Sequence, residues 1–275
     1  ITGLSDVNPS RSVGDRVGTN VTWSRPFGRH QIQTGGVFNY DKTTTNNESN
    51  ANGSFVFTGI YTANGSALGG LTGFDFADFL LGMPQQATLA YGPGETTLTG
   101  RDVGFFVQDE WRYRGNLTFN LGVRWDLRYP FVEENGRLVN LDVNSDFSAA
   151  APVVSGQAGT FSGSFPRALI DKDTNNVSPR LAAAWRGPGQ LQYRGSWEVQ
   201  YNDNTYSGIA RRLAQQPPFA TTGTNIGGLS RALLMESALT GINISETRNN
   251  YGIERDYVVG NVHQAVFGVV RKLFR

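Results

Sequence analysis

Hydrophobic and polar residues alternate strictly along several stretches of this chain. In LTFNLGVRWDLRY (117–129), every odd-numbered residue is apolar, and every even-numbered residue is polar or glycine. Side chains of a β-strand point alternately to its two faces, so one face of this strand is apolar while the other carries Arg124, Asp126 and Arg128. The alternation predicts a strand whose two faces meet different surroundings.

Six further stretches show a similar alternation, which predicts about seven strands in all. They cover residues 16–24, 30–41, 101–113, 180–186, 190–202 and about 261–271. Three short turn sequences join six of the seven strands into pairs. RPFGR joins 16–24 to 30–41, RGN joins 101–113 to 117–129, and GPG joins 180–186 to 190–202. Turns this short predict antiparallel hairpins. Asp109 interrupts the apolar face of its strand, and the last strand is apolar on both faces.

Long segments rich in Gly, Asn, Ser and Thr separate the hairpins, at 42–100, 130–179 and 203–260. A compact soluble domain seldom carries structureless loops of this length. Short turns at one end and long loops at the other are typical of outer-membrane β-barrels, so we expect these segments to be extracellular loops. In the first, FDFADFLLGMP predicts a short amphipathic helix at 74–84, packed against a strand at 54–62.

The predicted strands have the length and the aromatic residues of membrane strands. About 9–11 tilted residues cross a bilayer, and Trp and Tyr gather at the membrane–water interface. Aromatic residues near the ends of the apolar faces are candidates for such a girdle. They are Trp23, Tyr40, Trp111, Tyr129, Trp185 and Tyr201. The pattern favours an all-β, antiparallel transmembrane barrel segment, with a soluble sandwich or β-helix as the alternative.

Composition narrows the class of protein further. Charged residues make up 17% of the 275 residues, and the 24 Lys and Arg nearly balance the 23 Asp and Glu, so nothing indicates a nucleic-acid partner. There is no cysteine, which excludes disulfides and thiolate metal sites.

No signal peptide opens the sequence, and no apolar run is long enough for a spanning helix. In a membrane this chain would cross as strands, and we expect it to be part of a longer protein.

The polar faces of the strands supply the candidate site residues. We expect six of them to face a lumen: Arg16, Arg124, Asp126, Arg128, Arg194 and Glu198. They would contact a plug or line a substrate path. The simpler interpretation is an ordinary polar lumen, in which Arg194 and Glu198 are close enough along one strand to pair.

No metal site, cofactor or catalytic centre is predicted. LDVNSD (141–146) and DKDTNN (171–176) offer oxygen ligands, but both lack the glycine and distal glutamate of an EF-hand loop. His30 and His263 lie on separate strands, with no nucleophile pattern near them. We therefore do not expect an enzyme.

Longer motifs resemble a known family. GFFVQDEWRYRGNLTFNLGVRWDLRYP (104–130) closely resembles a strand pair of TonB-dependent outer-membrane receptors. FADFLLGMP (76–84), NNVSPRLAAAW (175–185) and NYGIERDYVVGNVHQ (250–264) resemble further landmarks of the Oar-like subgroup. That subgroup is common in acidobacteria and carries a carboxypeptidase-regulatory-like domain before its plug.

The resemblance implies a larger assembly than this chain. Such receptors are barrels of about 22 strands around a plug, and they import a scarce extracellular ligand with energy relayed by TonB. This chain would be an internal segment of one outer-membrane barrel domain (1–275), without the plug and the TonB box. Its partners would be the lipid bilayer, the plug and remaining strands, the TonB complex and an unidentified ligand. Alone it should form an open, curved sheet. A small adhesin or structural barrel, or a soluble secreted carbohydrate-binding β-protein, are the alternatives.

Overall fold

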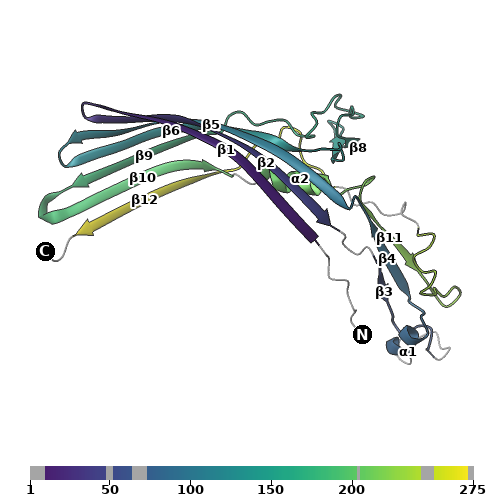
Figure 1. The fold of residues 1–275 in the computed structure, drawn as a ribbon. Helices are drawn as coiled ribbons and strands as arrows, with labels where there is room; N and C mark the ends of the chain where they lie inside the picture. The colour runs from purple at the N-terminus through teal and green to yellow at the C-terminus, as the bar shows by residue number, and fades with distance from the viewer. Residues whose placement is uncertain (1–9, 48–51, 64–72, 203–204, 243–250, 272–275) are drawn as a thin grey trace.

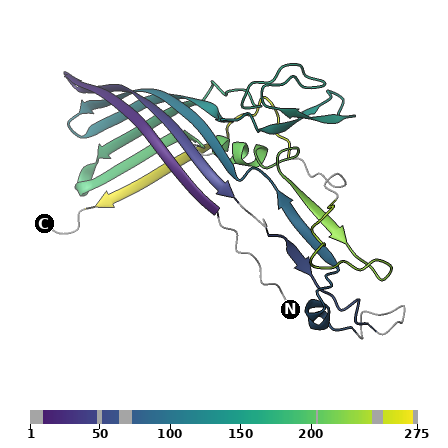
Figure 2. The ribbon, with the colours of Figure 1, turned by 45° about the vertical axis from the view of Figure 1, so that its right-hand side comes forward.

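The computed structural model describes residues 10–47, 52–63, 73–202, 205–242 and 251–271. Seven antiparallel strands form its main sheet, in the order β1-β2-β5-β6-β9-β10-β12. Their bounds are β1 (Ser10–Phe27), β2 (His30–Asn47), β5 (Glu95–Arg114), β6 (Leu117–Glu133), β9 (Val177–Arg186), β10 (Leu191–Tyr201) and β12 (Asn261–Arg271). The sheet is curved and open, with β1 and β12 as its edges, as predicted (Figures 1 and 2).

Each of the seven predicted strands is present, but several are longer than predicted. β1 pairs with β2 over their whole length, from Ser10 opposite Asn47 to Phe27 opposite His30. β5 begins at Glu95 and β6 ends at Glu133, inside segments that the sequence indicated as loops. Some of the added residues, such as TTTNN in β2, are polar on both faces, whereas Leu98 of β5 and Phe131 and Val132 of β6 pack in a hydrophobic core. Backbone pairing therefore continues beyond the point where the hydrophobic alternation ends.

The three tight turns and the long connections lie at opposite ends of the sheet (Figure 1). We call these the turn end and the loop end. The first turn uses Gly28 at φ 61°, and the third is a 3₁₀ turn at Pro188–Gln190 with Gly189 at φ 69°. A positive φ costs glycine little and other residues more, which explains glycine at these two positions.

The described parts of the long connections contain more regular structure than the one helix and one strand predicted for the first of them. The first contains β3 (Ser54–Val56), α1 (Asp75–Leu80) and β4 (Gln86–Tyr91), and the second contains the hairpin of β7 (Val139–Val143) and β8 (Ala150–Val154). The third contains α2 (Thr205–Leu213) and β11 (Thr221–Ile226), which joins a small sheet of order β11-β4-β3. Elements distant in sequence form this sheet, so local patterns did not reveal it.

The predicted helix and strand in the first connection are both present, although shorter. The helix is α1, and the strand expected over 54–62 is reduced to β3. Their packing follows the prediction, because the rings of Phe57 and Phe79 meet edge to face at 5.3 Å. Neither described helix is long and apolar enough to cross a membrane.

The main hydrophobic core lies at the loop end and not across the sheet. α2 contributes Tyr206, Ile209 and Leu213 to this core, and β5 contributes Leu98. The remaining members come mainly from the connections, including Leu169 and Val259. This core fixes the connections to the end of the sheet. It leaves the middle and the turn end of the convex face uncovered.

Candidate functional site

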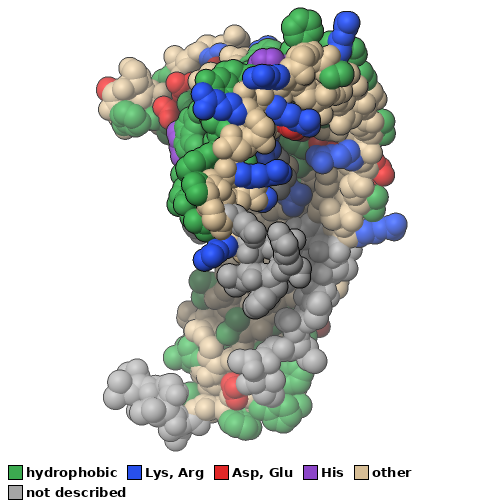
Figure 3. Space-filling view, turned by 90° about the vertical axis from the view of Figure 1, so that its left-hand side faces the viewer, with side chains coloured by type: hydrophobic (Ala, Val, Ile, Leu, Met, Phe, Trp, Pro, Cys, Tyr) green, Lys and Arg blue, Asp and Glu red, His purple; other side chains and the backbone are tan. Residues whose placement is uncertain are grey.

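The convex face of the seven-stranded sheet is apolar and exposed. Val17 and Val21 of β1 are 69% and 65% exposed, and Phe105 of β5 is 54% exposed. Viewed from the turn end, hydrophobic side chains lie on the outer flank while Lys and Arg side chains gather inside the curve (Figure 3). A contiguous apolar surface of this extent is unfavourable in water and is removed from water by lipid.

The six predicted girdle residues divide into two groups along the strands. Trp23, Trp111 and Trp185 lie toward the turn end, whereas Tyr40, Tyr129 and Tyr201 lie toward the loop end. Neighbouring aromatic rings extend the first group. Trp185 stacks on Tyr193 at 5.2 Å, and Trp111 lies 5.7 Å from Phe119. Two aromatic belts separated by apolar side chains are the arrangement expected of a membrane wall.

A polar pair interrupts the convex face close to the turn end. His30 Nδ1 lies 2.6 Å from Asp109 Oδ2, and the His30 ring stacks on Trp111 with centroids 5.5 Å apart. The sequence showed Asp109 as an isolated break in the apolar pattern. Its partner follows only from the register, in which Ile32 lies opposite Asp109 and His30 lies opposite Trp111.

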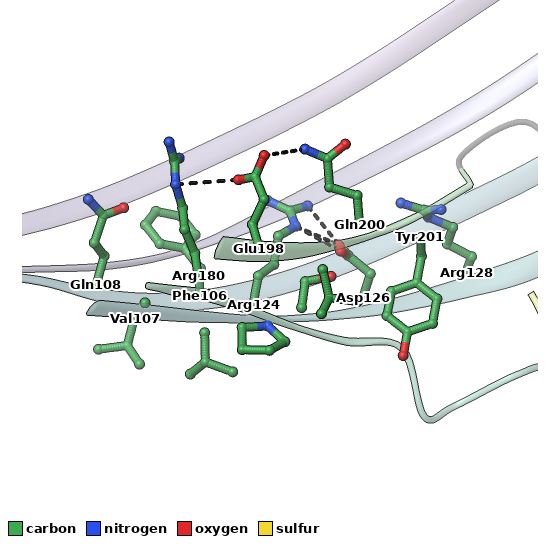
Figure 4. A pocket seen from close by; sticks show the side chains of 15 residues that line it. Phe106, Val107, Gln108, Arg124, Asp126, Arg128, Arg180, Glu198, Gln200 and Tyr201 are labelled. Carbon is green, nitrogen blue, oxygen red and sulfur yellow. Dashed lines mark hydrogen bonds and ion pairs between the residues drawn. The ribbon is translucent and has the colours of Figure 1, made fainter. Parts of the chain in front are cut away.

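The concave face carries the predicted polar residues and encloses a cavity of about 450 Å³ (Figure 4). β5, β6, β9 and β10 form its walls. Gln108, Arg124, Arg180, Glu198 and Gln200 project from this side of the sheet, whereas Val107 projects from the other. Alternation along each strand therefore separates the two faces here as the sequence predicted.

Ion pairs and hydrogen bonds connect the charged side chains of this cavity. Arg124 Nη2 lies 2.7 Å from Asp126 Oδ1, and Arg180 Nε lies 3.5 Å from Glu198 Oε2. Gly104 lies opposite Asp126 on β5 and makes room for the first pair. A Cβ there would lie 2.6 Å from both Arg124 Nη2 and Asp126 Oδ1. Arg180 is exposed, so its pair with Glu198 contributes at most about 1 kcal/mol and sets the polarity of the wall more than its stability. Asp126 is buried, and Arg124 supplies the charge that its carboxylate needs there.

The expected pair of Arg194 with Glu198 is not formed. Arg194 donates to Gln192 Oε1 at 3.0 Å, while Glu198 pairs with Arg180 on the neighbouring strand and accepts from Gln200 at 2.7 Å. A residue on the neighbouring strand is a nearer partner than one four positions along the same strand.

Arg16 and Arg128 lie apart from this cluster. Arg16 pairs with Asp41, directly opposite it on β2, with Nη2 to Oδ2 at 3.0 Å. Arg128 lines the cavity at its loop-end side (Figure 4). The pairing of Arg16 with Asp41 depends on the register of β1 and β2, so the sequence did not reveal it.

The two oxygen-rich stretches use their carboxylates in internal hydrogen bonds. Asp142 accepts from the hydroxyl and backbone N–H of Ser162 and from the N–H of Phe161. Burial raises the pKa of Asp142, but these hydrogen bonds outweigh it and hold the pKa below its ordinary value. Asp173 accepts from the backbone N–H groups of Asn175 and Val259. In the described residues, no group of three His, Asp or Glu is arranged to hold a metal ion.

An antiparallel sheet with an uncovered apolar convex face and a charged concave face defines a wall segment of a membrane β-barrel. A family model for the outer membrane beta barrel domain matches residues 2–275. The chain belongs to that family, is located in the bacterial outer membrane and contacts its lipid bilayer. No curated protein and no solved structure gives a significant match.

Proposed function

We propose that this domain forms part of the barrel of a TonB-dependent, Oar-like receptor that imports an extracellular ligand. The motifs over 104–130 and 175–185 support this proposal, since they resemble that receptor family and occupy consecutive strands of the wall. The role is non-enzymatic: the wall encloses the import path, and the connections at the loop end gather the ligand.

The observation that carries the proposal is the pair of open sheet edges. In the described parts of the chain, β1 and β12 each have one neighbouring strand, and no ladder joins them. An unpaired row of backbone N–H and C=O groups is costly in hydrocarbon, because each group there lacks a hydrogen-bond partner. Further strands of the same protein would satisfy these groups. A barrel of about 22 strands, as in the receptors that the motifs resemble, would be wide enough to need a plug.

The concave face of β12 supports the presence of a plug. Val262, Val266 and Val270 lie opposite Gln200, Ser196 and Gln192, which are lumen-facing residues of β10. These three valines are 66%, 53% and 54% exposed. Gln264 and Gly268 lie between them on this face. A water-filled lumen would leave the three valines in water, whereas a plug packed against β12 would bury them.

TonB binding by the complete protein tests this proposal. We expect the purified receptor to bind the soluble C-terminal domain of TonB in calorimetry, and a variant without the TonB box to lose binding. In planar bilayers, deletion of the plug should convert a closed protein into a wide pore. A protein that binds no TonB and stays closed would instead be a small structural or adhesin barrel.

A further inference from the structure

A second cavity lies at the loop end on the convex side of the sheet, away from the lumen. It has a volume of about 540 Å³ and is walled by β2, β5, β6 and the segment 166–172. We call it the rim cavity. Tyr40, Arg101 and Tyr129 cross its floor as a row, because Arg101 lies opposite Tyr40 on one side and Tyr129 on the other.

The position of this row sets the depth of the rim cavity in the membrane. Phe38, Val103 and Leu127 form the next row on the same face, two residues closer to the middle of the strands. Tyr40 and Tyr129 belong to the aromatic group at the loop end. The rim cavity therefore lies where the apolar band gives way to the headgroups of the outer leaflet.

The rim cavity is rich in positive charge. The Arg101 guanidinium lies 4.2 Å from the centre of the Tyr129 ring, and Lys172 Nζ lies 5.5 Å from the centre of the same ring. Arg167 adds a third cation. The one carboxylate in the lining, Asp171, is already paired with Arg255 at 3.0 Å. Within the described part of the chain, none of the three cations forms an ion pair with a carboxylate.

Three cations without carboxylate partners at headgroup depth favour an anionic ligand. Guanidinium groups bind phosphate oxygens in bidentate fashion, and basic residues at a membrane surface attract anionic lipids. Val132, Pro166 and Ile170 add apolar surface beside the cations, which suits the part of a lipid where headgroup meets acyl chain. A soluble ligand on the import path would face the concave side instead.

We propose that the rim cavity binds the phosphate group of an anionic lipid in the outer leaflet, held by Arg101 and Lys172 with Arg167 at the entrance. Binding there would brace the segment 166–172 against β6 from the membrane side. The site is independent of ligand import, since it opens on the opposite face of the wall.

Native mass spectrometry of the complete protein in neutral detergent tests the proposal. The probes are phosphatidic acid, which carries a phosphomonoester, and phosphatidylcholine, which has no net charge. We expect preferential retention of phosphatidic acid. The double variant Arg101→Gln/Lys172→Gln should bind it roughly 25-fold more weakly, about fivefold for each cation removed. Arg25→Gln is the matched control, because Arg25 lies on the convex side at the turn end and should leave binding unchanged.

Arg167→Gln tests the site without changing a residue of the sheet, because Arg167 belongs to no strand. Its replacement should weaken lipid binding about fivefold. Equal retention of the two lipids would overturn the proposal, and so would unchanged binding in both the double variant and Arg167→Gln. Inorganic phosphate that binds as tightly as the lipid would assign the cavity to a soluble phosphate compound and would overturn the lipid assignment.

Discussion

His30 and Asp109 form a 2.6 Å polar contact on the convex face of the wall, where most of the neighbouring side chains are apolar. Among the residues that the structure describes, Asp109 Oδ1 is buried without a hydrogen-bond partner, and His30 is the side chain that contacts this carboxylate, through Oδ2. A carboxylate left alone beside hydrocarbon is costly, whereas removal of both partners leaves an apolar surface. We therefore expect the contributions of His30 and Asp109 to the folding free energy to be strongly coupled.

A double-mutant cycle measures this coupling. We expect His30→Phe, which keeps a ring on Trp111, to cost more stability alone than together with Asp109→Leu. The coupling free energy should be about 1 kcal/mol or more in urea titrations of the complete protein folded into vesicles. Additive effects of the two substitutions would show that Asp109 does not depend on His30.

Neighbouring residues of β5 test the assignment of the two faces. Val107 is 45% exposed on the convex side, and Gln108 points into the lumen at nearly the same depth. Val107→Arg should cost about 2–4 kcal/mol of folding free energy near the middle of the bilayer. Gln108→Arg should cost much less, because its charge would face other polar groups. Equal costs in the same folding assay would contradict the orientation of the wall.

Much of this wall could be predicted from the sequence, because two solvents impose a strict period of two on every strand that they both contact. That period places Arg124 and Glu198 on one face of the sheet and Val107 on the other. The alternation stops near the loop end of β1 and β2. The sequence therefore did not predict that β1 begins as early as Ser10 or that β2 continues to Asn47. The open edges followed from the count of strands and from the resemblance.

The remaining features depend on contacts between distant residues. The pairs Arg180–Glu198 and Arg16–Asp41 require a known register, and the small sheet joins residues 54–56 with 221–226 through β4. The rim cavity brings Lys172 from a connection onto Tyr129 of β6. Such contacts between residues distant in sequence depend on tertiary packing, so no local pattern of side chains predicts them.

Two adjacent glycines in β2 should respond differently to the same substitution. A Cβ at Gly35 would lie 2.4 Å from the backbone carbonyl oxygen of Val21 and 2.8 Å from the ring of Phe106. At Gly36 the nearest atoms are 3.4 Å away, in the ring of Phe105. Gly35→Ala should therefore cost about 1–3 kcal/mol, since the carbonyl belongs to the β1–β2 pairing and moves only with the strand.

Gly36→Ala is the matched control, and it should be close to neutral in the same folding titration. It places the new methyl group one residue away, on the opposite face of the same strand. If both variants lost equal stability, the sensitivity of Gly35 would come from the flexibility of β2 and not from close approach to β1.

Asp142 gives the hairpin of β7 and β8 a dependence on pH. Its Oδ2 accepts from the N–H of Ser162 at 3.1 Å, and its Oδ1 accepts from the Ser162 hydroxyl at 2.5 Å. Because the pKa of Asp142 is lower in the folded state than its ordinary 3.8, the ionised carboxylate stabilises the fold. That contribution is fully present above the unfolded pKa and is lost as the pH falls through the folded pKa.

Hydrogen exchange at the amides of Phe161 and Ser162 should follow this change. We expect protection in the complete protein to be constant near neutral pH and to fall once the pH drops below about 4. Asp142→Asn should cost about 1–3 kcal/mol of local opening free energy at neutral pH, since an amide oxygen accepts more weakly than a carboxylate. Asp146→Asn, which changes an exposed carboxyl in the same hairpin, should leave those two amides protected. Loss of protection in both variants would mean that total charge, and not the Asp142 hydrogen bonds, orders this connection.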